Sequence, residues 1–227
     1  KTYDTSTAAT VIGTATLNGI VGADDVTLNS PSVTYNFGTA SAGASKPVTV
    51  LGFTLNGTAS ANYTVAQPTG ITATINKAAS TISVTGAFTF TYNGTAQGPN
   101  TSSVTGSTGA VSYNYTGVSP VVAASSTRPT NVGSYTVNAT VTPDSNYEAA
   151  TSTDFSFAIG KADQTITLAE TDAKTTATTT YTLSANASSG LAITYSSSNS
   201  AVATISGNTV TIVGAGSTTI TASQAGN

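Results

Sequence analysis

The sequence of 227 residues contains no His, Cys, Met or Trp, and only 7% of its residues are charged. Without His or Cys, the usual transition-metal sites, the cysteine nucleophile and the Ser-His-Asp triad are excluded. Six Lys and Arg against nine Asp and Glu leave a net charge of -3. This balance provides no basic footprint for nucleic acid, so we expect no nucleic-acid partner.

Long hydrophobic runs are also missing. No stretch approaches the roughly 20 apolar residues that a membrane-spanning helix needs, so we expect no membrane insertion. The sequence shows no signal peptide either, as expected of an internal or mature fragment. The absence of cysteine fits a cytosolic protein and a secreted bacterial repeat protein equally well.

What is present favours strands. Hydrophobic residues make up 38% of the chain, and Val, Ile and Thr, which suit a pleated and half-buried surface, are abundant. No segment has a useful length of helical periodicity, and turn signals separate short alternating runs. We predict an all-β protein with strands at 48–55, 63–75 (broken at 68–70), 88–92, 111–115, 135–141, 165–168, 181–185, 191–195, 202–205, 209–213 and 218–222.

One sequence pattern occurs twice, and we call it the Asn-Tyr repeat. Asn62-Tyr63 leads to Ile75-Asn76-Lys77-Ala78, and Asn146-Tyr147 leads to Ile159-Gly160-Lys161-Ala162 with the same spacing. A pattern that recurs at a fixed spacing predicts a tandem array of immunoglobulin-like β-sandwich modules at 1–77, 78–160 and 161–227. The last residues approach a third copy, which predicts a truncated third module. Modules this small are marginal alone, so we expect neighbours to stabilise one another.

The first module carries a set of recognisable motifs. They are Lys1-Thr2-Tyr3-Asp4, Ala8-Ala9-Thr10, Thr14-Ala15-Thr16-Leu17, Val21-Gly22-Ala23-Asp24-Asp25-Val26-Thr27-Leu28, Lys46-Pro47-Val48-Thr49-Val50 and Asn62-Tyr63-Thr64. This module resembles the YDG repeat of large bacterial surface proteins. The glycine of the Tyr-Asp-Gly signature is replaced by Thr5, which affects the local turn.

The other two modules resemble different families. The second contains Tyr92-Asn93-Gly94-Thr95-Ala96-Gln97, Arg128-Pro129-Thr130-Asn131-Val132-Gly133 and Asp144-Ser145-Asn146-Tyr147, and it resembles the mostly-beta, glycine-rich (MBG) module. The third contains Tyr195-Ser196-Ser197-Ser198-Asn199, Ala201-Val202-Ala203 and 214–222, and it resembles a group 2 bacterial immunoglobulin-like domain.

These resemblances imply an extracellular repeat array, as in very long adhesins and filaments of Gram-negative bacteria. Such modules are mostly spacers without catalytic residues. We therefore expect a structural stalk segment at the bacterial cell surface or in a secreted filament, with no enzymatic activity and no cofactor. The expected partners are neighbouring modules of the same long chain and other copies in a fibre.

Two acidic pairs are candidate Ca²⁺ ligands, because this ion takes six to eight oxygens. Asp24 and Asp25 are the only adjacent acids, and a solvated turn is the simpler interpretation. Glu170 and Asp172 lie on one face of a strand near a module boundary. For them a surface pair is favoured over a Ca²⁺ site or a glycosidase dyad, since no cleft signal accompanies them.

Five residues are expected to have structural roles. Lys77 and Lys161 mark strand ends at module boundaries, although a lysine near an Asn and an acid can also form an intramolecular isopeptide bond. Tyr135 follows Gly133 into a long alternating strand, as in the tyrosine corner of immunoglobulin-like sandwiches. Tyr63 and Tyr147 belong to the two copies of the Asn-Tyr repeat.

Three alternatives to a stalk stay open. The segment could bind a glycan or another surface ligand through tyrosine-bearing loops such as 113–118. It could also be a linker region of a secreted multidomain enzyme. In the third alternative, a strand from one chain completes the sheet of a neighbouring chain.

Overall fold

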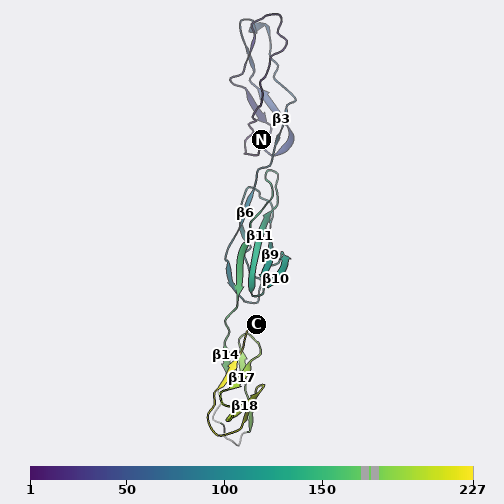
Figure 1. The fold of residues 1–227 in the computed structure, drawn as a ribbon. Coiled ribbons are helices and arrows are strands. Elements are labelled where there is room, and N and C mark those ends of the chain that lie inside the picture. The colour runs from purple at the N-terminus through teal and green to yellow at the C-terminus, as the bar shows by residue number, and fades with distance from the viewer. Residues whose placement is uncertain (170–173, 175–178, 227) are drawn as a thin grey trace. The chain divides into compact units, whose positions relative to one another are not determined.

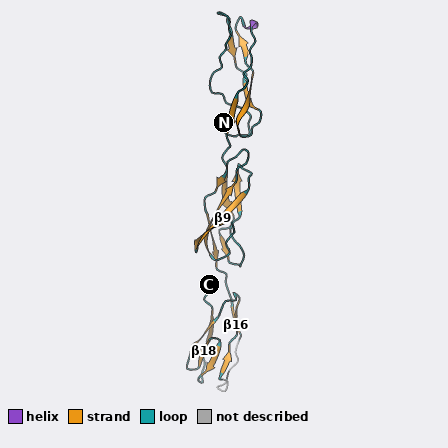
Figure 2. Ribbon diagram, turned by 90° about the vertical axis from the view of Figure 1, so that its right-hand side faces the viewer, coloured by secondary structure: helices purple, strands orange, loops and turns teal. Residues whose placement is uncertain are grey.

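The computed structural model describes residues 1–169, 174 and 179–226. The prediction of an all-β protein is confirmed: the described part folds into several sheets, with one short 3₁₀ turn at Ser60–Asn62 (Figure 2). In this part of the chain, no helix has the length and apolar character to cross a membrane. The chain forms two compact units, Lys1–Gly160 and Lys161–Asn227.

The first half of unit one is built around a three-stranded sheet with the order β2-β3-β5, whose central strand β3 is labelled in Figure 1. A second sheet pairs β1 with β4. Phe37, Val48, Val50, Phe53 and Ile75 form the buried core of this half. The strands are β1 (Thr27–Asn29), β2 (Thr34–Phe37), β3 (Gly43–Leu51), β4 (Thr54–Asn56) and β5 (Thr72–Ile75).

Two strand predictions in this half are confirmed only in part. The predicted strand 48–55 is divided between β3 and β4 at Gly52, whose φ is +102°. A Cβ at Gly52 would lie 2.6 Å from the carbonyl oxygen of Ser32, so the turn needs glycine here. Of the predicted strand 63–75, only β5 forms, and residues 63–67 make no strand.

The second half of unit one is a larger sandwich. Its main sheet has the order β10-β9-β11-β13-β7, with β12 beside β11, and β6 pairs with β8 in a second sheet. The β7 and β13 strands run parallel. These strands are β6 (Thr81–Thr85), β7 (Thr89–Thr91), β8 (Thr101–Thr105), β9 (Val111–Ser119), β10 (Val121–Ser125), β11 (Gly133–Val141), β12 (Ala150–Thr151) and β13 (Phe155–Gly160).

The core of this sandwich follows from the alternation along β11. Tyr135, Val137, Ala139 and Val141 are buried, while the residues between them are half-buried. Because successive side chains of a strand point to opposite faces, these four lie on the core face. They pack with β6, β9 and β13 in one cluster that also contains Ile82, Val84, Tyr115, Phe157 and Ile159.

The described residues of unit two form three small sheets with the orders β14-β16, β15-β19-β18 and β17-β20. Its fully buried core consists of Leu183, Ala203 and Val210. The predicted strand 181–185 is divided into β15 and β16. The strands are β14 (Ile166–Leu168), β15 (Thr180–Thr182), β16 (Ala185–Ala187), β17 (Thr194–Ser197), β18 (Ala203–Ser206), β19 (Thr209–Ile212) and β20 (Ile220–Ser223).

Candidate functional site

The second copy of the Asn-Tyr repeat begins with a turn organised by the carboxylate of Asp144. Its Oδ1 accepts hydrogen bonds from the backbone amides of Asn146 at 2.8 Å and Tyr147 at 2.9 Å. Its Oδ2 accepts from the amide of Thr108 at 2.9 Å and from the Thr108 hydroxyl at 3.2 Å. These donors lower the pKa of Asp144 to about 2, with the Thr108 amide as the largest cause.

The chain enters the second module along this turn. The ammonium of Lys77 donates to the carbonyl oxygen of Asp144 at 2.6 Å. The amide of Ala78 donates to the carbonyl of Asn146 at 2.9 Å, and the amide of Glu148 donates to the carbonyl of Ala78 at 2.8 Å. Ala78 and Tyr147 thus form a parallel β-bridge, which fixes the entering segment against the Asn-Tyr repeat.

The same turn also contacts the first module. The side-chain oxygen of Asn146 accepts a hydrogen bond from the backbone amide of Ala42 at 3.0 Å. The rings of Tyr3 and Tyr147 meet edge to face, with centroids 5.4 Å apart and an interplanar angle of 80°. Such aromatic pairs contribute about 0.5–1.5 kcal/mol beyond their buried area. We call residues Tyr3, Ala42, Lys77, Asp144, Asn146 and Tyr147 the module junction.

The module junction joins the two halves of unit one, each with its own core cluster, which correspond to the first two predicted modules. The Lys77 ammonium is bonded to a backbone carbonyl, and the carboxamide oxygen of Asn146 is bonded to Ala42. These contacts assign Lys77 a hydrogen-bonding role. Lys161, its counterpart in the other copy of the repeat, is exposed at the start of unit two.

Tyr63, in the first copy of the repeat, lies in a different environment. Its hydroxyl donates to Oδ2 of Asp24 at 2.7 Å and accepts from the amide of Val21 at 3.0 Å. The hydrogen bond to Asp24 raises the pKa of Tyr63. Asp25 Oδ2 accepts from the amide of Thr58 at 3.0 Å and from its hydroxyl at 3.1 Å, and these bonds lower the pKa of Asp25.

The acidic candidates for Ca²⁺ are therefore placed as follows. Asp24 and Asp25 are exposed, and each has one carboxylate oxygen bonded to a protein donor. Glu170 and Asp172 lie outside the described residues. Among the residues that are described, no group of three or more His, Cys, Asp or Glu side chains is arranged to hold a metal ion.

Tyr135 is held at the start of β11 as a structural residue. Its hydroxyl donates to the carbonyl of Asn131, four residues earlier, at 2.8 Å. Its ring stacks on Phe157, with centroids 5.4 Å apart. This local hydrogen bond is the arrangement of a tyrosine corner.

The tyrosines at 113–118 do not lie in a loop, so that part of the sequence interpretation is wrong. Tyr113 and Tyr115 are within β9, because this segment pairs with β11 over its whole length. The Tyr115 hydroxyl donates to the carbonyl of Pro99 at 2.7 Å, and the Tyr113 hydroxyl donates to Ser102 Oγ at 3.0 Å. Both hydroxyls are therefore engaged inside the second module.

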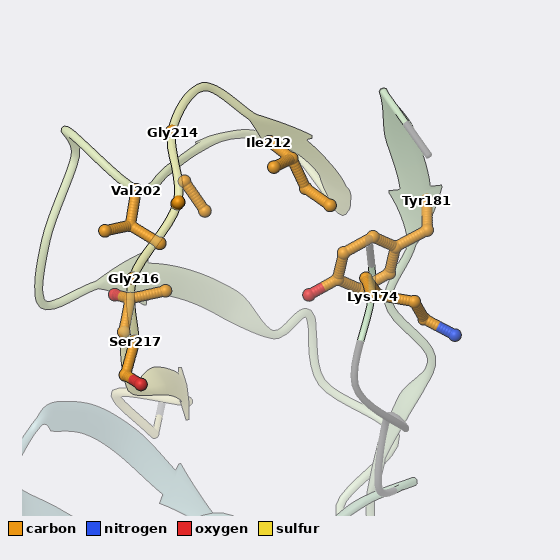
Figure 3. Close-up of a pocket in the computed structure, with 10 residues that line it drawn as sticks. Lys174, Tyr181, Val202, Ile212, Gly214, Gly216 and Ser217 are labelled. Atoms are coloured by element: carbon orange, nitrogen blue, oxygen red, sulfur yellow. The ribbon is translucent and has the colours of Figure 1, made fainter. Parts of the chain in front are cut away.

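Unit two contains an open pocket of about 440 Å³ beside β15 and β19 (Figure 3). The Tyr181 hydroxyl points toward its middle, while the Lys174 ammonium lies 5.7 Å from the Tyr181 ring centroid and points away from the other lining residues. The side chains of Val202 and Ile212 form an apolar part of the pocket wall. A Cβ at Gly216 would lie 2.8 Å from Val202 Cγ2, so glycine lets this loop approach closely. Lys174, Ser217 and Thr218 add polar groups to the lining of this pocket.

Acid should weaken the module junction through Asp144. The folded-state pKa of about 2 lies below the ordinary value of 3.8, so the stabilisation is present above pH 4 and is lost as the pH falls toward 2. We expect the free energy of unfolding of unit one to fall across this window, as measured by urea denaturation. Asp144→Asn should flatten the dependence. An unchanged acid slope in this variant would contradict the assignment.

Sequence reasoning identified Lys77 and Tyr147 but missed their partners Tyr3 and Ala42. The motif Asp144-Ser145-Asn146-Tyr147 did contain a usable signal, because an Asp side chain often accepts a hydrogen bond from the backbone amide two residues later and so forms a turn. No local pattern marks Ala42, which contributes only a backbone amide.

The turn at Tyr3-Asp4-Thr5 keeps the conformation that a Tyr-Asp-Gly signature provides. Thr5 has a φ of +66°, in the left-handed region that favours glycine. Asp4 Oδ1 accepts from the amide of Ser6 at 2.9 Å and pairs with the Lys1 ammonium at 2.8 Å.

Neither the curated proteins nor the solved structures yield a match to this chain. Residues 1–70 match the family model described as the YDG domain, which supports the resemblance of the first module to a YDG-type repeat.

Proposed function

We propose that this chain is a structural repeat segment of a large secreted or cell-surface bacterial adhesin or extracellular filament. The observation that carries the proposal is the module junction. There a recurring sequence pattern holds the entering chain through Ala78 and the preceding module through Asn146. In this proposal the second module is of the MBG type and the third is a group 2 immunoglobulin-like domain.

The path of the chain through the second module suits a load-bearing role. The chain enters at Ala78, passes through β6 into β7 and leaves through β13, and β7 and β13 are parallel neighbours. A pull on the two ends slides these strands along each other. It therefore loads the bonds from Tyr92 to Gly160 and from Ala158 to Phe88, at 2.9 Å each, at the same time.

The alternatives receive less support. Glycan binding through 113–118 loses its basis because both tyrosine hydroxyls are engaged within the module. A linker in a secreted enzyme uses the same junction chemistry, and the identity of the flanking domains separates it from an adhesin.

The proposal is tested on the natural material. Antibodies raised against the 227-residue chain should label the surface or extracellular fibres of intact producing cells. They should also detect a polypeptide much larger than 22.3 kDa. Labelling only after permeabilisation would contradict a surface or extracellular role.

Asn146→Ala should loosen the module junction. The change leaves the half-buried amide of Ala42 without its acceptor, which costs about 1 kcal/mol of unfolding free energy. NMR relaxation should then show more independent tumbling of the first and second modules. Asn138→Ala is the matched control, since Asn138 bonds to Asp154 within the second module. Equal loosening by both variants would contradict the role of Asn146.

A further inference from the structure

The two copies of the Asn-Tyr repeat occupy equivalent positions in their modules. Tyr3 donates its amide to the carbonyl of Asn76 at 2.8 Å, as Tyr92 does to Gly160 at 2.9 Å. Each of these acceptors follows a buried isoleucine by one residue, Ile75 in β5 and Ile159 in β13.

The glycine that opens the neighbouring strand confirms the correspondence. Gly43 of β3 lies opposite Ile75, and Gly133 of β11 lies opposite Ile159. Asn62-Tyr63-Thr64 is therefore the counterpart of Asn146-Tyr147-Glu148.

The backbone of the first copy is open where that of the second copy is paired. The carbonyl of Asn146 and the amide of Glu148 both bond to Ala78. Among the described residues, no protein group pairs with the carbonyl of Asn62 or the amide of Thr64, and both residues are exposed.

The chemistry of a partner for this surface follows from the second module. There the occupant is Lys77-Ala78, and a Lys-Ala pair recurs at Lys161-Ala162. The carbonyl of Ser60 stands two residues before Asn62, as that of Asp144 stands before Asn146, and a carbonyl oxygen has two lone pairs with which to accept a lysine ammonium.

We propose that Asn62–Thr64 is a docking site for an extended Lys-Ala segment that leads from a neighbouring module into the first module. The inference rests on the proposed function as a repeat array, and it names the surface that receives the next member. The segment pairs with the repeat as Ala78 does. The amide of its alanine donates a hydrogen bond to the Asn62 carbonyl, and the carbonyl of the same alanine accepts one from the Thr64 amide.

The test uses a synthetic peptide with the sequence of residues 75–85, added to the full chain. At saturation, the Thr64 amide should exchange with solvent at least about tenfold more slowly, while amides of unit two stay unchanged. A peptide with proline in place of Ala78 has no amide to donate to Asn62. This proline peptide should leave the exchange rate of the Thr64 amide unchanged. Equal protection by both peptides would overturn the proposal.

A tethered version keeps the test decisive if the free peptide binds weakly. Placing residues 75–89 directly before Lys1 reproduces the spacing of the second module, and tethering raises the effective concentration to about millimolar. An unprotected Thr64 amide in this chain would overturn the proposal. That result concerns the docking surface alone, whereas cell-surface labelling tests the proposed function separately.

Discussion

Replacing Ile159 by alanine should lower the free energy of unfolding of unit one by about 2–5 kcal/mol. Ile159 is 1% exposed and lies in β13, within the core cluster of the second module. Its removal leaves a cavity in this core cluster, because a close-packed interior relaxes only in part. Chemical denaturation followed by tyrosine fluorescence measures the loss.

The control for this variant is Ile12→Ala, which removes the same atoms from a side chain that is 100% exposed. A surface change of this kind should stay within about 0.5 kcal/mol. Unit two should unfold as before in both variants, since its core of Leu183, Ala203 and Val210 is a separate cluster. Similar losses of unfolding free energy in the Ile12 and Ile159 variants would contradict the burial of Ile159 in this core.

In the proposed stalk, loss of the Ile159 side chain should have a second effect. A segment that carries load is limited by its weakest module, and β13 supplies both the core residue Ile159 and the hydrogen bonds to β7. Loss of the core should therefore speed unfolding of the second module under force.

The sequence was most informative where alternation and burial coincide. The run 135–141 could be predicted because four core residues repeat at every second position of β11. Two alternating strands, β6 and β13, were nevertheless missed. The strand β8 was missed because Ser and Thr fill four of its five positions. In such strands the hydroxyl residues hide the pattern.

The module junction was predictable only in part. The repeated spacing identifies Lys77 and Tyr147 from sequence, because a boundary must recur in an array. Its cross-module contacts depend on the fold, which brings Tyr3 and the amide of Ala42 to the second copy of the repeat. A backbone amide leaves no trace in the sequence, so Ala42 required a structure.

The second large effect is expected at Gly109, which packs against the strand end that leads to Asp144. A Cβ on Gly109 would lie 2.1 Å from the carbonyl oxygen of Thr142 and 2.5 Å from its hydroxyl. Because the nearest atom belongs to the backbone, the collision cannot be relieved by a side-chain rotation. We expect Gly109→Ala to lower the free energy of unfolding of unit one by about 3 kcal/mol or more.

The displacement should also reach the module junction, which gives this variant a second readout. Thr108 precedes Gly109 and supplies two of the hydrogen bonds that hold the pKa of Asp144 at about 2. Moving Thr108 away should raise that pKa toward 3.8, as an NMR titration of the carboxyl carbon would measure. Gly38→Ala is the matched control, because its Cβ would meet nothing within 4 Å. A stable Gly109→Ala chain with an unshifted Asp144 would show that Thr142 and Thr108 do not link this glycine to the junction.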